Sequence, residues 1–439
     1  MKNKYFAIAL IALWFSTGAG AMTYKESVEL ALKNNPAVIT SQKKLDAAKA
    51  RFGQAMGAFL PTVKLDANYG QSYTQPSTVQ FTTQTATGAS TTSMTFGTDE
   101  KATVKSWTFS ASQPLFVAAL FPGFSLAQRG VDAAQEDFRK SVLETKFNVT
   151  AAFYGVLATE KFFKLSEDSL NMAQSHLNQV DVMLKSGVAT RADQLRAKVQ
   201  VANSEVALTQ ARNSLELAKS SLNNVLGRNA DKELEITEEK TGEIPSLPEY
   251  RALINSAFEN SPNWKGFVLN RRMAEDNLSL NRTSLFPAFM LTGQNGFRGT
   301  EYSSYKSEST SWTVAGVASW TLFDGLGMQN RINEAAANLE ATKATEEQVR
   351  NGVILEVRRA YLDLKSAVET IGSAKKAVDF AEESHKVSGL RFNSGVGTNL
   401  EEIDAQVALT QARTNYLKAL FDLEIAKAEL NKVIGKEAI

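Results

Sequence analysis

The chain has 439 residues with 48 basic and 47 acidic side chains, so its charge is nearly balanced. This balance gives no electrostatic reason to expect nucleic acid as a partner. The chain contains no cysteine, which excludes disulfides and thiolate metal sites. Its only histidines are His176 and His385, so an enzyme would have to rely on carboxylates, lysines and hydroxyls.

The N-terminus has the pattern of a secretory signal peptide over residues 1–21. Lys2 and Lys4 precede an apolar run that ends at Phe15, and small residues follow up to Ala21. We expect cleavage after Ala21, because the A-x-A-like pattern ends there. The run is too short for a transmembrane anchor, and no later stretch approaches about 18 continuous apolar residues. The sequence therefore predicts an exported chain that is periplasmic, secreted or an outer-membrane β-barrel.

The same order of features occurs twice along the chain. ALKNNP at residues 31–36 corresponds to AFENSP at residues 257–262. The matching positions further along are Gly187, Thr190 and Gly227 in the first half and Gly395, Thr398 and Gly435 in the second half. A repeat of roughly 200 residues is far longer than a solenoid unit. We therefore divide the mature chain into a first repeat, residues 22–245, and a second repeat, residues 246–439.

Each repeat is predicted to contain a helix, a β-hairpin and a long helical hairpin. The expected ranges are 62–116 and 288–323 for the β-hairpins and 120–227 and 326–435 for the helical hairpins. The first β-hairpin holds extra residues within the Thr-, Ser- and Gln-rich segment 75–100, which predicts a long polar loop. Residues 228–245 form a linker whose acidic part, DKELEITEEK, predicts a solvated connector.

The sequences of the helical hairpins contain a seven-residue repeat. The segment VALTQAR occurs identically at residues 206–212 and 407–413. In both hairpins apolar residues alternate steps of three and four: Leu208, Ala211, Leu215, Ala218, Leu222 and Val225, matched by Tyr416, Ala419, Leu423, Ala426, Leu430 and Val433. This pattern predicts coiled-coil packing with close helix approach at the alanines. An uninterrupted helix of sixty residues would extend about 90 Å, which requires an elongated assembly.

The segments before the helical hairpins alternate apolar and polar residues with period two. Strands of about ten residues with this pattern suit a transmembrane barrel. Trp107, Trp312 and Trp320 are predicted to lie in these strands, as an interfacial aromatic belt would require. A soluble β-domain with one buried face is the alternative, and the strands alone favour neither.

Whether such strands can cross a membrane depends on whether they can close into a barrel. Bacterial barrels begin at about eight strands. Four strands per chain cannot close, and open edges are not tolerated in lipid. If the strands span a membrane, several chains must therefore share one barrel. Three chains would give twelve strands, the smallest symmetric closure that leaves room for a channel.

At these motifs the chain resembles the TolC-like outer-membrane efflux protein family. The resemblance rests on ALKNNP, on Phe59-Leu60-Pro61, on SQPLF at residues 112–116 and on WTLFDG at residues 320–325. The second tip, GVGTNLEEIDAQ at residues 395–406, is similar to the family pattern G-x-x-T-x-x-D-V-L-D-A-Q. The resemblance covers nearly the whole mature chain, and the order of the motifs is its most specific feature.

The resemblance implies a mainly α fold with β structure in a homotrimer. A shared twelve-stranded transmembrane β-barrel would lie in the outer membrane of a Gram-negative-type cell, and coiled-coil helical hairpins would continue it as a periplasmic tunnel. Family members serve as the exit duct of tripartite efflux or type I secretion systems. Their partners are an inner-membrane pump, a periplasmic adaptor (membrane fusion) protein and outer-membrane lipid. The pump supplies the energy, so the resemblance implies no enzyme activity, cofactor or metal.

The resemblance also implies a constriction at the periplasmic end, with acidic rings and charge links between helix pairs. Glu401 and Asp404 fall on the ring positions, where threefold repetition would repel anions and attract cations. Asp193 falls on an acidic link position, and Arg191 and Arg196 are close to it in sequence.

The turns of the two tips are predicted to form around Gly187 and Thr190 and around Gly395 and Thr398. Gly397 departs from the family pattern, because a linking arginine can stand at this position. The alternative for the tip charges is a set of solvated turn residues, each ion pair contributing about 0–1 kcal/mol. Taken together, Glu401 and Asp404 favour the gate.

Two other functions were weighed. A periplasmic coiled-coil scaffold or adaptor with a soluble β-domain would explain the heptads but not the tryptophan-bearing strands of both repeats. An exported hydrolase would need a convergent site, and the sequence has no H-E-x-x-H, G-x-S-x-G or paired histidine motif. His176 and His385 lie on predicted helices and are expected at the surface rather than as ligands.

Overall fold

The computed structural model describes residues 21–73, 75–86, 88–96, 99–237 and 244–436, so the predicted signal peptide lies outside the described residues apart from Ala21. The elements in chain order are α1 (Tyr24–Asn34), α2 (Pro36–Gly57), β1 (Thr62–Tyr73), β2 (Ser77–Thr85), β3 (Gly88–Phe96), β4 (Lys101–Phe116), α3 (Leu120–Lys185), α4 (Arg191–Val225), α5 (Tyr250–Asn260), α6 (Pro262–Arg282), the 3₁₀ turn η1 (Thr283–Leu285), β5 (Ala288–Glu301), β6 (Lys306–Ser319), α7 (Gly327–Asn393) and α8 (Asn399–Ile434).

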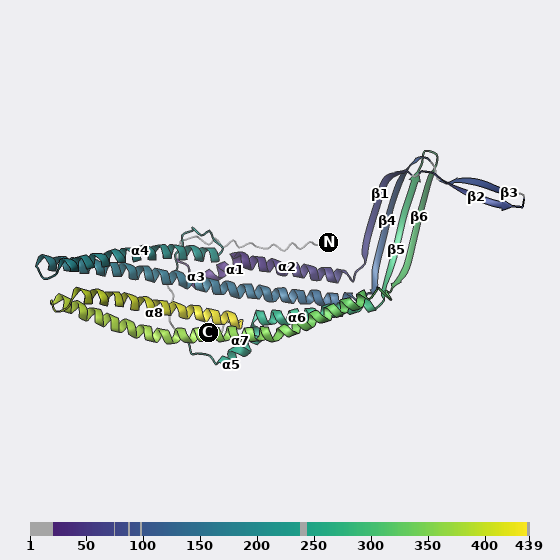
Figure 1. Ribbon diagram of the computed structural model, residues 1–439. Helices are drawn as coiled ribbons and strands as arrows, with labels where there is room; N and C mark the ends of the chain where they lie inside the picture. Colours follow the sequence, from purple (N-terminus) through teal and green to yellow (C-terminus); the bar gives the residue numbers. More distant parts are fainter. Residues whose placement is uncertain (1–20, 74, 87, 97–98, 238–243, 437–439) are drawn as a thin grey trace, which may run out of the picture. The chain divides into compact units, whose positions relative to one another are not determined.

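The element lengths confirm the internal duplication. Helices α1 and α5 have 11 residues each, and α2 and α6 have 22 and 21. The long helices α3 and α7 have 66 and 67 residues, and their partners α4 and α8 have 35 and 36. Each long helix is followed by its partner in an antiparallel hairpin (Figure 1).

No helix within the described residues combines the length and the apolar composition that crossing a bilayer needs.

The chain packs as two units, and each unit contains segments of both repeats. The first unit comprises residues up to 45, 134–268 and 346–439, and the second comprises residues 46–133 and 269–345. The first unit is helical and holds both helical tips. The second unit holds the strands and the adjoining ends of the long helices.

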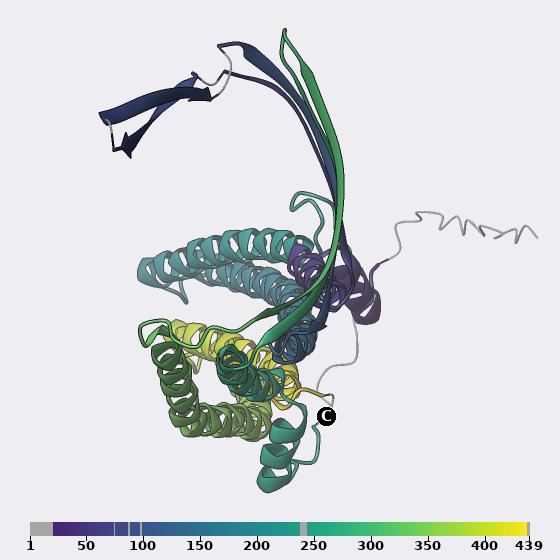
Figure 2. The same ribbon diagram turned by 90° about the vertical axis from the view of Figure 1, so that its right-hand side faces the viewer.

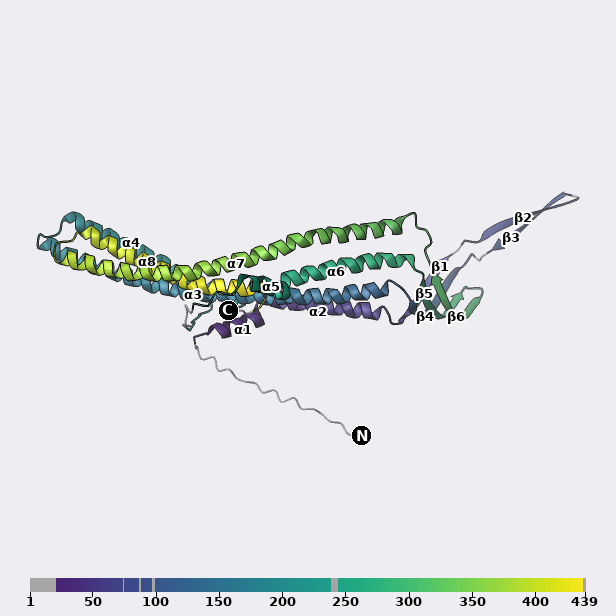
Figure 3. The same ribbon diagram turned by 90° about the horizontal axis from the view of Figure 1, so that it is seen from below.

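The first unit has two large apolar cores and a smaller cluster of Val180, Ala197 and Phe392 near the tips. One core joins α1, α3 and α4 around Phe153 and Leu222, and the other joins α5, α7 and α8 around Leu364 and Leu423. Every apolar position of the predicted heptads is buried or half-buried. The heptad prediction for these hairpins is therefore confirmed, and α3 lies beside α4 as α7 lies beside α8 (Figures 1 and 3).

Two equivalent glycines fix how the short helices dock. Gly227 and Gly435 have φ angles of +69° and +76°, a region that costs other residues strain. A Cβ at Gly227 would lie 2.5 Å from the carbonyl oxygen of Asn34, and a Cβ at Gly435 would collide with the carbonyl oxygen of Asn260. The end of each helical hairpin therefore packs directly on the backbone at the end of α1 or α5.

The linker is more ordered than its acidic sequence predicts. Leu234 is buried in the core of the first repeat, and Ile236 forms a parallel bridge with Met22. Thr237 N donates to the Met22 carbonyl over 2.9 Å. The prediction of a purely solvated connector is wrong for this part, because alternating apolar residues between the acidic ones face inward.

The second unit contains a four-stranded antiparallel sheet in the order β1-β4-β5-β6 (Figure 1), which Figure 2 shows nearly edge-on. Register places one set of side chains on a single face: Val63, Leu65 and Tyr69 of β1, Trp107 and Phe109 of β4, Phe289 and Leu291 of β5, and Trp312 and Val314 of β6. Thr, Ser, Asn and Gln predominate on the opposite face. Strands β1 and β6 are the edges, and neither has a second partner among the described strands.

The predicted polar loop is wrong in part, because residues 77–96 form a second sheet. Strands β2 and β3 pair in register from Ser77↔Phe96 to Thr85↔Gly88. Thr side chains meet across this pair, as between the Thr78 and Thr95 hydroxyls at 3.3 Å. The Thr-rich composition suggested a loop, although Thr is also a favourable strand residue.

The second β-hairpin ends earlier than predicted. Strand β6 stops at Ser319, so Trp320 follows the strand and donates its indole N–H to the Leu285 carbonyl over 3.2 Å. Asp324, in the same WTLFDG motif, accepts a hydrogen bond from Met328 N at 3.0 Å. The motif therefore ends the strand and starts α7, instead of extending β6.

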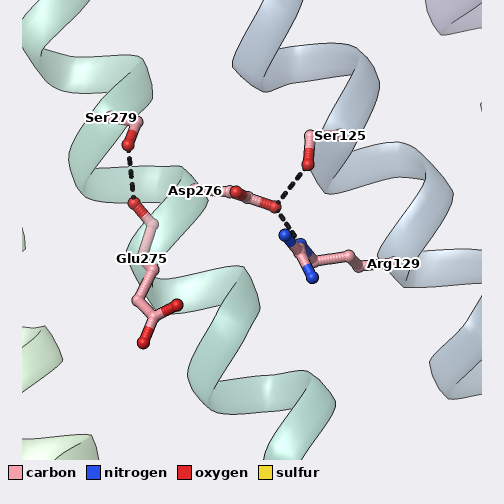
Figure 4. A network of polar contacts seen from close by, with 5 residues as sticks. All are labelled: Ser125, Arg129, Glu275, Asp276 and Ser279. Carbon is pink, nitrogen blue, oxygen red and sulfur yellow. Dashed lines mark hydrogen bonds and ion pairs between the residues drawn. The ribbon is translucent and has the colours of Figure 1, made fainter.

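A polar contact joins α3 to α6 within the second unit (Figure 4). The Asp276 carboxylate accepts hydrogen bonds from the Arg129 guanidinium and from Ser125 Oγ, the latter at 2.9 Å. The side chain of Asp276 is 15% exposed, so this ion pair is partly desolvated. Glu275 does not take part, and its carbonyl accepts from Ser279.

We expect Gly435→Ala to lower the apparent Tm of the detergent-solubilised protein. The substitution adds a Cβ against the Asn260 carbonyl and imposes a left-handed backbone on alanine, a strain of about 1–3 kcal/mol. Gly352→Ala is the matched control, since Gly352 is exposed within α7 and a Cβ there meets nothing within 4 Å. Equal melting temperatures for the two variants would contradict the docking role of Gly435.

Candidate functional site

The two helical tips have the same backbone construction. Gly187 and Gly395 follow the long helices with φ angles of +78° and +72°. Val188 N donates to the Met183 carbonyl at 2.9 Å, and Val396 N donates to the Arg391 carbonyl at 3.0 Å. These bonds close each long helix with a left-handed residue, which glycine adopts without strain.

The second helix of each hairpin begins with a capping box. Asp193 N donates to Thr190 Oγ1 at 3.2 Å, while the Asp193 carboxylate accepts from Thr190 N at 3.0 Å. Thr398 and Glu401 make the same reciprocal pair, at 3.2 and 3.3 Å. The acidic residues predicted for a link and a ring therefore also satisfy backbone groups at their own helix ends.

Arg391 supplies a cation at the second tip that the sequence analysis did not identify. Its Nε lies 3.7 Å from a Glu401 carboxylate oxygen. A side chain at Gly397 would come within 2.9 Å of the Arg391 Cβ, so the turn requires glycine there. The cation belongs to the last turn of α7.

The remaining predicted charges take different positions. Arg191 donates to the side chain of Gln194, whose amide donates to Asp181 at 2.6 Å. Arg196 is exposed and electrostatically close to Asp193. Asp404 is exposed on α8, one turn beyond Glu401. The structure thus pairs Glu401 with Arg391, whereas Arg196 lies near Asp193 and helps to lower the pKa of its carboxyl.

A buried hydrogen bond joins the two tips within one chain. His176 of α3 and Asn399 of α8 are 7% and 4% exposed, and His176 Nε2 lies 2.6 Å from Asn399 Oδ1. The Asn399 amide donates to the Asp193 carbonyl at 3.2 Å. The prediction of a surface position for His176 is wrong, because α8 of the second hairpin covers it.

The same seam continues one heptad away from the tip. Gln406, 1% exposed, donates its amide to the Ser169 carbonyl at 3.2 Å. Thr410 Oγ1 lies 3.5 Å from Ser169 Oγ. Polar contacts therefore recur at seven-residue spacing on both α3 and α8. That spacing was visible in the sequence, but nothing in it paired the two helices.

Glu402 is a buried acidic side chain beside the tip. It is 7% exposed, and its Oε1 lies 3.3 Å from Nδ1 of half-buried His385 on α7. Its Oε2 is buried without a hydrogen-bond partner. Gly389 of α7 lies beside this carboxylate, and a Cβ there would be in ordinary van der Waals contact with both oxygens at 3.5 Å. Both histidines of the chain therefore flank the first turns of α8, on opposite hairpins.

Acid is expected to loosen the first tip. The pKa of Asp193 lies below its ordinary value of 3.8, chiefly because the Thr190 hydroxyl donates to the carboxylate. Such a carboxylate stabilises the folded tip at pH above that ordinary value, and the stabilisation is lost as pH falls through the lowered pKa.

The measurement is deuterium uptake of residues 186–200, corrected for the intrinsic exchange rate. Uptake in the unmodified chain should rise below a pH of about 4, and Asp193→Ala should show high uptake already at neutral pH. Lys198→Ala, which removes an exposed charge from the same helix, should behave like the unmodified chain. A flat uptake profile from neutral pH to pH about 2 would refute this role of Asp193.

The sequence of this chain is similar to those of known proteins. A sequence model described as outer membrane efflux protein matches residues 27–228 and 253–436. The cobalt-zinc-cadmium resistance protein CzcC of Cupriavidus metallidurans is 26% identical over 317 residues, which cover 71% of each chain. Outer membrane protein TolC of Escherichia coli is 19% identical over 441 residues, covering 98% of this chain and 85% of TolC.

A solved structure shows the same fold. The crystal structure of CusC, described in terms of transmembrane channel formation, superposes with a TM-score of 0.78 at 16% identity and covers 99% of both chains. The family match includes both repeats and both helical tips. The chain therefore belongs to the outer membrane efflux protein family.

Proposed function

We propose that three copies of this chain form the outer-membrane exit duct of a tripartite efflux or type I secretion system. The observation that carries the proposal is the open four-stranded sheet, whose apolar side chains share one face and whose edges β1 and β6 lack partners. Unpaired backbone groups cannot face lipid, so β6 of one copy would pair with β1 of the next. Three copies close twelve strands.

In this arrangement the two faces of the sheet would have different surroundings. The face with Val63, Leu65, Trp107 and Trp312 would contact lipid, and the Thr-, Ser- and Asn-rich face would line the lumen. Trp107 and Trp312, with Trp320 just beyond β6, would contribute to the aromatic belt. The helical hairpins would continue the channel into the periplasm as a tunnel. We propose no catalytic step for the duct, because the pump would supply the energy.

The partners we propose are a periplasmic adaptor protein and an inner-membrane pump. Members of the family work as homotrimers with such partners. The helical tips would be the end of the duct that faces the pump, because the strands enter and leave the membrane at the opposite end of the long helices. Cargo would be selected before it reaches the duct.

We propose that Glu401 and Asp404 form acidic rings at the tip and favour cations there. Asp404 is exposed and so can face a lumen. Glu401 shares its carboxylate with the Thr398 cap and with Arg391, so it would contribute less charge than Asp404. Asp404→Asn should therefore lower the cation preference of single channels more than Glu401→Gln does.

The closed tip would be held by the charge pair of Asp193 and Arg196, with Arg191 nearby, and by the buried bond between His176 and Asn399. Asn399 connects α8 to both α3 and α4, so it links the two hairpins of one copy. Movement of one hairpin against the other would break this link. The polar seam supports such movement, because hydrogen bonds can exchange with water when the hairpins separate.

The proposed function is tested by native mass spectrometry of the particle extracted from an outer-membrane fraction. A trimer in that fraction is the expected result. A monomer recovered from the periplasm would remove the shared barrel and the channel together.

Loss of a tip link should raise single-channel conductance in planar bilayers. We expect this for Asp193→Ala, Arg196→Ala and Asn399→Ala, since a link of about 1 kcal/mol shifts the ratio of open to closed states about fivefold. Lys198→Ala, exposed on α4, is the control for simple loss of charge. Unchanged conductance in a variant that still forms trimers would count against the substituted residue as a latch.

A further inference from the structure

The large apolar side chains of the β2–β3 hairpin all lie on one face, which they share with Ser77, Thr83, Ser90 and Thr92. Val79, Phe81, Met94 and Phe96 fall on the same face by register, and each is 43–54% exposed. The opposite face carries only hydroxyl, amide and small side chains: Thr78, Gln80, Thr82, Gln84, Ala89, Thr91, Ser93 and Thr95. A connector has no need of such segregation, which indicates that the apolar face contacts something.

No other strand among the described residues pairs with this hairpin, so strands β2 and β3 form a sheet of their own. An isolated two-stranded hairpin is marginally stable in water, and a hydrophobic face needs further strands or another surface to pack on. The second repeat connects β5 to β6 by a short turn instead, so each copy has a single such hairpin.

Topology places the hairpin next to the neighbouring copy. It is inserted between β1 and β4, at the strand ends opposite the helices, and it follows the edge strand β1 after a few residues. At its base the Tyr73 hydroxyl donates to Asp99 at 2.5 Å, and Glu100 accepts from Ser304 at 3.0 and 3.1 Å. The base is thus attached to both halves of the sheet, and the β1 edge is where the next copy would join.

The charge pattern fits self-association around a threefold axis. No charged residue occurs between Asp66 and Asp99. Near a symmetry axis each residue approaches its own copies, so any charge there would meet a like charge and be repelled. A neutral hairpin avoids this cost. Binding to a lipid surface would instead favour Lys, Arg or Trp around the apolar residues, and the hairpin has none of them.

We propose that the three hairpins of a trimer pack their apolar faces on one another and form a cover over the outer end of the channel. This inference rests on the proposed trimer. The partner surface is the same hairpin in two other copies, with Phe81 and Met94 at the contact.

The test uses the absence of cysteine from the chain, which gives single-cysteine variants no background. Phe81→Cys and Met94→Cys are introduced separately into the full chain in outer membranes, with Thr82→Cys and Ser93→Cys as neighbours on the opposite face. A mild oxidant is added, and disulfide-linked dimers are measured on denaturing gels. Disulfides need Cβ atoms about 4 Å apart, so we expect at least about tenfold more dimer from the apolar positions.

Native mass spectrometry of each variant distinguishes failure of the hairpin proposal from failure of the proposed duct. An intact trimer that gives no more dimer from Phe81→Cys and Met94→Cys than from the controls overturns the hairpin proposal and leaves the duct in place. In that case a water-soluble maleimide identifies the surroundings: protected thiols indicate burial in lipid, and labelled thiols indicate exposure to water. Failure of the unmodified chain to form a trimer would overturn the duct instead.

Discussion

The unpaired edges of the four-stranded sheet are the constraint on which the rest of this protein depends. Strands β1 and β6 expose backbone groups that a membrane cannot satisfy, although the apolar face between them suits lipid well. No element among the described residues covers either edge, so the sheet needs a further partner to be stable in lipid. Each repeat supplies one pair of strands and one helical hairpin.

The helical unit divides its interface between apolar and polar packing. Around Leu222 and Leu423 the hairpins have dry cores, and Gly227 and Gly435 let them dock tightly on α1 and α5. Toward the tips, hydrogen bonds from His176 and Gln406 accompany a smaller apolar cluster of Val180, Ala197 and Phe392. Apolar cores resist separation, whereas hydrogen bonds can be replaced by water at modest cost. The packing thus suits a fixed body with tips that can part.

The tips also show how one residue can serve two purposes. Asp193 and Glu401 are capping residues for α4 and α8, and they occupy the positions where the family resemblance implies gate charges. A carboxylate that accepts from its own helix end is held in place without help from a neighbouring copy. The carboxylate therefore keeps a fixed position, although part of its charge is shared with the cap. Asp404 has no such local role and stays exposed.

The sequence by itself determined the duplication, the helical hairpins, the main strands and the tip turns, because these depend on local spacing: heptads, period-two alternation, glycines and capping threonines. Only the tertiary structure decided which residues meet. Thr-rich residues 77–96 are compatible with loop or strand until a partner strand is present, and Trp320 lies outside β6 because Asp324 starts α7 so soon after it. The pairing of His176 with Asn399 joins residues 223 positions apart in the chain, and no local pattern specifies such a contact.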